Sequence, residues 1–114
     1  MNYVKVKSNV IIHPKSFGRP AVMRIIRIAQ ETAPPNYDIT ITCAADGHKP
    51  GTSHREGNAF DFRTRDLPPR TSSETWADRM QKRLGDEYFV QAEPNKSCPD
   101  AAPHIHAQWN GKTL

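Results

Sequence analysis

The segment 58–64 alternates between two kinds of side chain, and this pattern limits the chain to a fold that contains a sheet. The residues at alternate positions are Asn58, Phe60 and Phe62, and those between them are Ala59, Asp61 and Arg63. Because successive side chains of a β-strand point to opposite faces, the two phenylalanines share one face and Asp61 lies on the other. The pattern predicts a strand with an aromatic face in the core and a carboxylate on the opposite face.

Three further segments alternate in the same way, and we expect strands at 38–43, 88–93 and 104–109. In the first, Ile39, Ile41 and Cys43 fall on one face. In the second, the residues that share a face are Phe89, Gln91 and Glu93. In the third, they are His104, His106 and Gln108. Residues 3–12 alternate only weakly and predict one or two short extended pieces that end at His13-Pro14.

Two helices are predicted between these strands. The first begins at Pro20, has an apolar stripe and stops before Pro34-Pro35; the stripe is Val22, Ile25, Ile26 and Ala29. The second begins with a capping box formed by Thr71 and Glu74 and ends near Gly85. Its predicted buried residues are Trp76, Ala77, Met80 and Leu84. Strands and helices in this order predict an α+β fold.

Size and composition indicate one globular domain, residues 1–114. Hydrophobic residues make up 36% of the chain and charged residues 25%, which is typical of a folded, polar protein. The net charge is +4, but the basic residues are scattered and no nucleic-acid-binding motif occurs, so no nucleic-acid partner is expected. We also expect no membrane insertion and no signal peptide, because no apolar run is long enough, and therefore a cytoplasmic location in the producing cell.

The histidines and acidic residues suggest a metal site. His54 and Asp61 are seven positions apart, and nitrogen and oxygen ligands of this kind bind zinc. A catalytic zinc site has three protein ligands, and the third is available from the strand that carries His104 and His106. A hydrolase also needs a carboxylate that accepts a proton, and Glu93 ends a strand beside a loop.

Simpler interpretations remain open for each of these residues. A histidine pair spaced as HxH arises often by chance, and Asp61 has arginines with which it can pair. Cys43 and Cys98 are either independent thiols or a pair formed across the fold. A purely structural zinc would need a fourth ligand, for which His48 and Cys98 are the candidates.

The sequence SHREGNAFDF, residues 53–62, resembles the SxHxxGxAxD signature of the zinc D,D-carboxypeptidase and D-alanyl-D-alanine dipeptidase family. DGH at 46–48 and HIH at 104–106 extend the resemblance to the Hedgehog domain and to small phage-encoded peptidoglycan peptidases, over about residues 38 to 109. The resemblance implies a Hedgehog/DD-peptidase-like α+β domain with a small central antiparallel sheet. Helices are expected on one side of this sheet and a mononuclear zinc on the other.

The same resemblance implies a role for each matching residue. His54, Asp61 and His106 match the zinc ligands, and Glu93 matches the glutamate that activates water. Two further histidines match groups beside the metal: His104 is an active-site histidine that is not a ligand, and His48 follows the DG pair.

The chain departs from the family pattern at two places. Glu93 precedes His106 by 13 positions, whereas the family base stands a few residues before the last ligand. The arginine that orients substrate in many carboxypeptidases is replaced by Ala44-Ala45-Asp46, which leaves Arg55 and Arg63 as alternatives.

The resemblance therefore predicts a Zn²⁺-dependent peptidase that hydrolyses peptidoglycan stem or cross-bridge peptides, in the manner of an endolysin. The alternative is a catalytically inactive zinc-binding module of the same fold, such as a phage virion component. The expected protein is a monomer that acts at the bacterial cell wall after release or as part of a virion. D,D-, L,D- and L-alanyl-D-glutamate bonds all remain possible targets.

Overall fold

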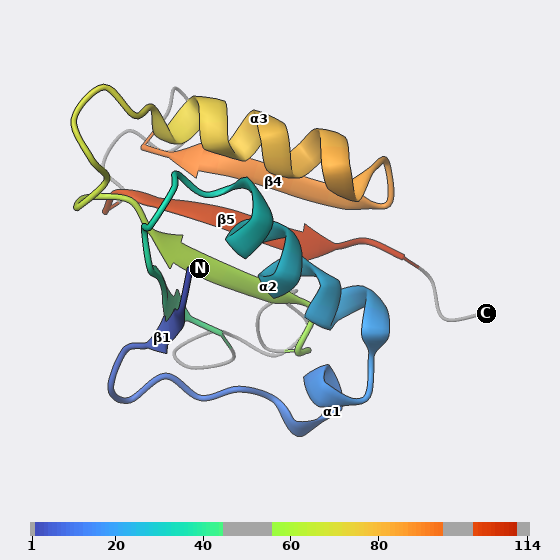
Figure 1. The fold of residues 1–114 in the computed structure, drawn as a ribbon. Helices are drawn as coiled ribbons and strands as arrows, with labels where there is room; N and C mark the ends of the chain where they lie inside the picture. Colours follow the sequence, from blue (N-terminus) through green and yellow to red (C-terminus); the bar gives the residue numbers. More distant parts are fainter. Residues whose placement is uncertain (1, 45–55, 95–101, 112–114) are drawn as a thin grey trace.

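The computed structural model describes residues 2–44, 56–94 and 102–111. Eight helices and strands occur in these residues (Figure 1). In chain order they are β1 (Val4–Val6), α1 (Pro14–Phe17), α2 (Pro20–Thr32), β2 (Ile39–Cys43), β3 (Ala59–Arg63), α3 (Ser73–Leu84), β4 (Tyr88–Glu93) and β5 (His104–Trp109). Both long helices and the four predicted strands are present, and the bounds of β4 and β5 agree with the alternating segments 88–93 and 104–109. The short helix α1 was not predicted.

Helix α2 begins where the sequence indicates, with Pro20 at its first position, and it ends at Thr32 before Pro34. Its buried residues are Val22, Ile25, Ile28, Ala29 and Thr32. Ile26, the third residue of the predicted stripe, is partly buried and packs against the core, whereas Ile28, which was not predicted, is fully buried. The buried face of α2 is therefore wider than the predicted stripe.

The capping residue of α3 is Ser72 and not Thr71. The backbone N–H of Thr71 donates to the carbonyl of Pro68, which keeps Thr71 in the preceding turn. The Ser72 hydroxyl accepts the N–H of Thr75 at 3.3 Å and donates to the carboxylate of Glu74 at 2.8 Å. At the other end, Gly85 stops the helix with φ at +96°, as predicted.

The five strands form one mixed sheet in the order β1-β2-β3-β5-β4. The pairs β2–β3, β3–β5 and β5–β4 are antiparallel, but β1 is parallel to β2. The expectation of an antiparallel sheet is therefore wrong at the β1 edge. Two parallel neighbours need a crossover between them, and α1 and α2 lie in the connection from β1 to β2.

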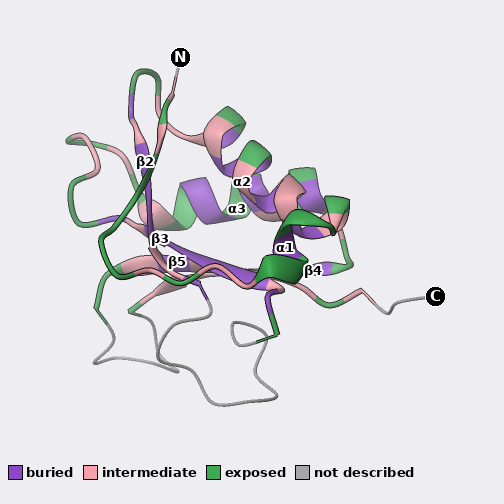
Figure 2. Cartoon of the chain, turned by 90° about the horizontal axis from the view of Figure 1, so that it is seen from below, coloured by how far each residue is buried: buried purple, intermediate pink, exposed green. Residues whose placement is uncertain are grey.

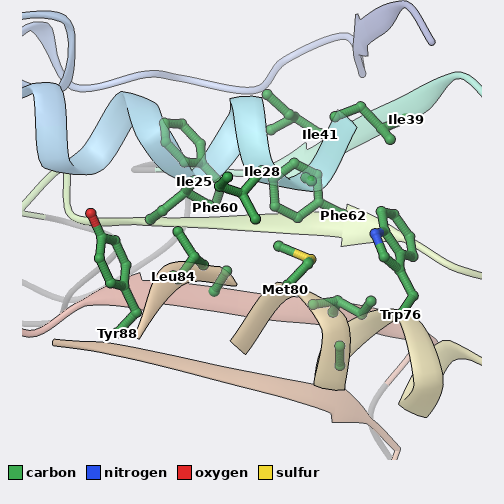
Figure 3. Close-up of a cluster of buried hydrophobic side chains, with 14 of the residues drawn as sticks. Ile25, Ile28, Ile39, Ile41, Phe60, Phe62, Trp76, Met80, Leu84 and Tyr88 are labelled. Carbon is green, nitrogen blue, oxygen red and sulfur yellow. The ribbon is translucent and has the colours of Figure 1, made fainter. Parts of the chain in front are cut away.

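Helices α2 and α3 lie on the same side of the sheet (Figures 1 and 2). Their apolar stripes pack on the sheet face formed by alternate residues of β2, β3 and β5. The largest fully buried side chains include Trp76, Met80, Ile25, Phe60 and Phe62 (Figure 3). The two phenylalanines thus enter the core as predicted, and Asp61 between them is left for the opposite face. We call this opposite face of β3, β4 and β5 the open face.

In the described parts of the chain, no helix has both the length and the apolar character needed to cross a membrane.

Candidate functional site

Strand register brings the predicted site residues of β3, β4 and β5 into rows on the open face. One row contains Asp61, then His106 opposite it on β5, then Gln91 on β4. The next row contains Arg63, His104 and Glu93. Because directly opposite residues of an antiparallel pair share a face, four predicted site residues come together: Asp61, His106, His104 and Glu93.

Asp61 and His106 face each other within the first row. The Nδ1 atom of His106 lies 3.1 Å from Oδ1 of Asp61, and its Nε2 atom lies 2.6 Å from Oε1 of Gln108. Burial lowers the pKa of His106, but the hydrogen bonds to Asp61 and Gln108 and the charges of Asp61 and Glu93 raise it by more. The pKa of His106 therefore lies above its ordinary value, and both ring nitrogens face oxygen acceptors, as expected for an imidazolium.

Glu93 and His104 make the shortest contact of the second row. Oε2 of Glu93 lies 2.6 Å from Nε2 of His104. The other ring nitrogen, Nδ1, lies 2.6 Å from the backbone carbonyl oxygen of Ala102. A carbonyl oxygen only accepts hydrogen bonds, so Nδ1 carries a proton and Nε2 is the atom that shares a proton with Glu93. Nε2 also lies 3.7 Å from Oδ2 of Asp61, which links the two rows.

A β-bulge changes the face on which Cys43 lies. Ile41 pairs with Phe62 and Cys43 pairs with Asp61, so Thr42 is an extra residue between the two pairs. The prediction that Cys43 shares the face of Ile39 and Ile41 was therefore wrong. Ala44, which follows it, is buried in the hydrophobic core. The bulge places Cys43 across from Asp61 at the edge of the open face.

Gly57 holds the start of β3 against α1. Its φ is +80°, and a β-carbon at this position would lie 2.8 Å from Cβ of His13 and 2.9 Å from Oγ of Ser16. The Ser16 hydroxyl also donates to the Gly57 carbonyl at 2.7 Å. Only glycine fits this close approach without strain, which explains why a glycine stands at this position of the HxxGxAxD sequence.

Several predicted residues lie outside the described residues: His48, His54, Arg55 and Cys98. Their predicted roles, including that of His54 as a zinc ligand, stay predictions. Sequence reasoning assigned no role to two groups that the structure adds to the site, Gln108 and the carbonyl of Ala102. Gln108 follows the same alternation as the histidines, so its face was predictable. The Ala102 carbonyl was not, because it depends on how the chain approaches β5.

The Asp61–His106 pair fits a zinc ion. Two ligand atoms that bind one tetrahedral zinc, each at about 2.0–2.1 Å, lie about 3.3 Å apart. The observed separation of Nδ1 and Oδ1, 3.1 Å, is close to this value. Within residues 2–44, 56–94 and 102–111, no group of three or more His, Cys, Asp or Glu side chains is arranged to hold a metal. The described residues thus provide two suitable donors, and the predicted third ligand, His54, lies outside them.

Comparisons with family models, with curated proteins and with solved structures give no match to this chain.

Proposed function

We propose that this protein is a zinc-dependent peptidase that hydrolyses peptide bonds of peptidoglycan, as a D,D-carboxypeptidase or an endopeptidase of endolysin type. The observation that carries the proposal is the convergence of Glu93, His104, Asp61 and His106 on the open face. In the sequence, Glu93 is separated from His106 by a loop, but the register of β4 and β5 places it directly opposite His104. Its distance along the chain is therefore no obstacle to a role as general base.

Asp61 and His106, together with the predicted ligand His54, would hold the zinc. Zinc in such a site polarises the carbonyl of the scissile bond and lowers the pKa of a water molecule. Glu93 would accept a proton from the attacking water and return it to the leaving amine, because its carboxylate lies on the open face in the row next to Asp61 and His106. His104, fixed by the Ala102 carbonyl through Nδ1, would keep the Glu93 carboxylate oriented through Nε2.

Digestion of purified peptidoglycan sacculi tests the proposal. The zinc-loaded protein should release peptides or single amino acids whose masses identify the bond that is cut. A chelator should stop the release, and added zinc should restore it. If the protein binds zinc but releases nothing from sacculi of any stem-peptide type, the peptidase proposal is wrong. The inactive zinc-binding module then becomes the better explanation.

A further inference from the structure

A line of polar side chains on the open face continues beyond the two histidines of β5. His104, His106 and Gln108 share this face of the strand. Asn110 continues the alternation just after Trp109, the last residue of β5. The proposed function uses the two histidines and leaves the two amides, Gln108 and Asn110, without a role.

The two amides form a chain of hydrogen bonds that ends on His106. Nε2 of His106 lies 2.6 Å from Oε1 of Gln108. The Nε2 atom of Gln108 in turn donates to Oδ1 of Asn110 at 2.5 Å. On the other side of the ring, Nδ1 of His106 lies 3.1 Å from Oδ1 of Asp61. The imidazole is therefore held between a carboxylate and an amide, and one ring nitrogen faces each of them.

The surroundings favour this arrangement of the amides. Gln108 lies directly opposite Ala59 of β3, whose small side chain leaves room for Gln108 to fold back along the strand towards His106. Asn110 is held through its backbone, because its N–H donates to the carbonyl of Glu87 at 2.7 Å. An amide oxygen only accepts hydrogen bonds, so Oδ1 of Asn110 faces the NH₂ group of Gln108. The oxygen of Gln108 is thereby directed to His106.

An acceptor beside Nε2 affects how His106 meets a metal ion. A histidine binds a metal through a nitrogen that carries no proton, and the proton on its other nitrogen then needs an acceptor. When an ion lies between Nδ1 and Asp61, these two groups no longer hold the ring through a shared proton. The hydrogen bond to Gln108 still opposes a turn of the ring about its Cβ–Cγ bond, which would put a carbon atom in the place of Nδ1.

We propose that Gln108, itself oriented by Asn110, is a positioning residue that fixes the ring of His106 so that Nδ1 binds the metal. This inference rests on the zinc site of the proposed function and adds the residues that set the orientation of one ligand. Gln108 acts through His106 alone. Partners that orient a metal-bound histidine in this way change metal affinity by about 10- to 100-fold.

The zinc affinities of three variants test the proposal. They are measured by competition with a chromophoric chelator at alkaline pH, where protons do not compete with zinc for His106. Gln108→Leu removes the acceptor and should lower the affinity about 10- to 100-fold. Gln108→Glu keeps an oxygen acceptor at the same length and should bind zinc at least as tightly as the wild type. Asn110→Leu leaves the Gln108 oxygen able to accept, so its affinity should fall by less than that of Gln108→Leu.

This limiting affinity is a separate quantity from the pH at which zinc binding begins to weaken. Equal losses in Gln108→Leu and Gln108→Glu would overturn the proposal, and so would an unchanged affinity in Gln108→Leu. Asn110 is exposed and lies outside the strands, so Asn110→Leu replaces Gln108→Leu if the latter fails to fold. An unchanged affinity in Asn110→Leu would then reject the chain of hydrogen bonds.

Gln91 provides the matched control. It lies directly opposite His106 on β4 and on the same open face, but the oxygen that contacts Nε2 of His106 belongs to Gln108. Gln91→Leu makes the same chemical change beside the same ligand and should bind zinc as the wild type does. A loss in Gln91→Leu as large as that in Gln108→Leu would show that general polarity near His106 is responsible, and the proposal would be wrong.

Nitrogen NMR of isotopically labelled histidine separates the orientation of the ring from the proposed function. With cadmium in place of zinc, the nitrogen of His106 that couples to the metal should be Nδ1, whether or not the protein cleaves peptidoglycan. Coupling to Nε2 would overturn the proposal.

A protein that binds neither metal contradicts the proposed function, and the metal-free protein then decides the orientation. The N–H at Nε2 of His106 should be protected from exchange with water in the wild type and in Gln108→Glu, and unprotected in Gln108→Leu. Equal exchange in all three proteins rejects the role of Gln108.

Discussion

Glu93 and His104 are opposite residues of β4 and β5, and their side chains meet at 2.6 Å between Oε2 and Nε2. They are separated by 11 positions in the sequence, because the connection between the two strands lies between them. Register, and not proximity along the chain, therefore places the carboxylate at the site. Oδ2 of Asp61 lies 3.7 Å from the same Nε2 atom. His104 therefore links Glu93 to the candidate ligand Asp61.

Substitution of Glu93 by glutamine should separate catalysis from metal binding. The amide keeps the size of the side chain but cannot accept a proton, so hydrolysis of peptidoglycan should fall at least about a hundredfold. The zinc content, measured by mass spectrometry of the metal, should remain that of the wild type. Glu87→Gln, at an exposed position before β4, is the matched control and should keep full activity. Normal activity of Glu93→Gln would exclude Glu93 as the base.

Zinc should stabilise the protein through Asp61 and His106. Ligands that bind only the folded state raise the free energy of unfolding, by about 2.7 kcal/mol at a concentration of 100 Kd. We expect the midpoint of thermal unfolding to rise with added zinc and to fall with a chelator. In Asp61→Asn the shift should be much smaller, whereas the exposed Asp78→Asn on α3 should respond as the wild type does. An unchanged zinc response of Asp61→Asn would remove Asp61 from the ligand set.

Zinc affinity should decrease as the pH falls, and it should begin to do so above the pH expected of an ordinary histidine. His106 must lose its proton before it binds a metal, and Asp61, Gln108 and Glu93 raise its pKa above about 6.5. In the metal-free protein, the raised pKa of His106 has the opposite effect on the pH dependence: it favours low pH for the stability of the fold. Protonated His106 stabilises the fold at low pH, and this contribution is lost as the pH rises through the raised pKa.

Competition with a chromophoric chelator at several pH values measures this effect. Gln108→Leu removes one of the hydrogen bonds that raise the pKa of His106, so its zinc affinity should persist to lower pH. A pH profile identical to that of the wild type would show that Gln108 does not hold the imidazolium form.

Gly57→Ala should destabilise the protein, because Gly57 has φ at +80° and a β-carbon there would come too close to His13 and Ser16. The left-handed backbone alone costs roughly 1–2 kcal/mol for alanine, and the contact at 2.8 Å adds to this. Gly18→Ala is the control, since its φ is −91° and the nearest atom to a new β-carbon is 3.8 Å away. Urea unfolding of both variants measures the difference. Equal stabilities would mean that α1 moves away at no cost.

The faces of the strands could be predicted from the sequence because a strand alternates its side chains by covalent geometry. Phe60 and Phe62 are buried and Asp61 lies on the other face for this local reason. The same rule failed at Cys43, where the bulge at Thr42 shifts the register. A bulge depends on how β2 pairs with β3, so the residues 38–43 alone do not predict it.

By itself, the sequence determined which residues form the long helices and the strands, and that Asp61, His104, His106 and Glu93 lie off the apolar faces. Only the tertiary structure decided which of them meet. Contacts between strands that are distant in the chain pair Glu93 with His104 and place β1 parallel to β2. They also bring Lys7 and Arg63 to the wall of one cavity. Local patterns fix the direction of a side chain, but its neighbours depend on register and strand order, which the packing of the whole core selects.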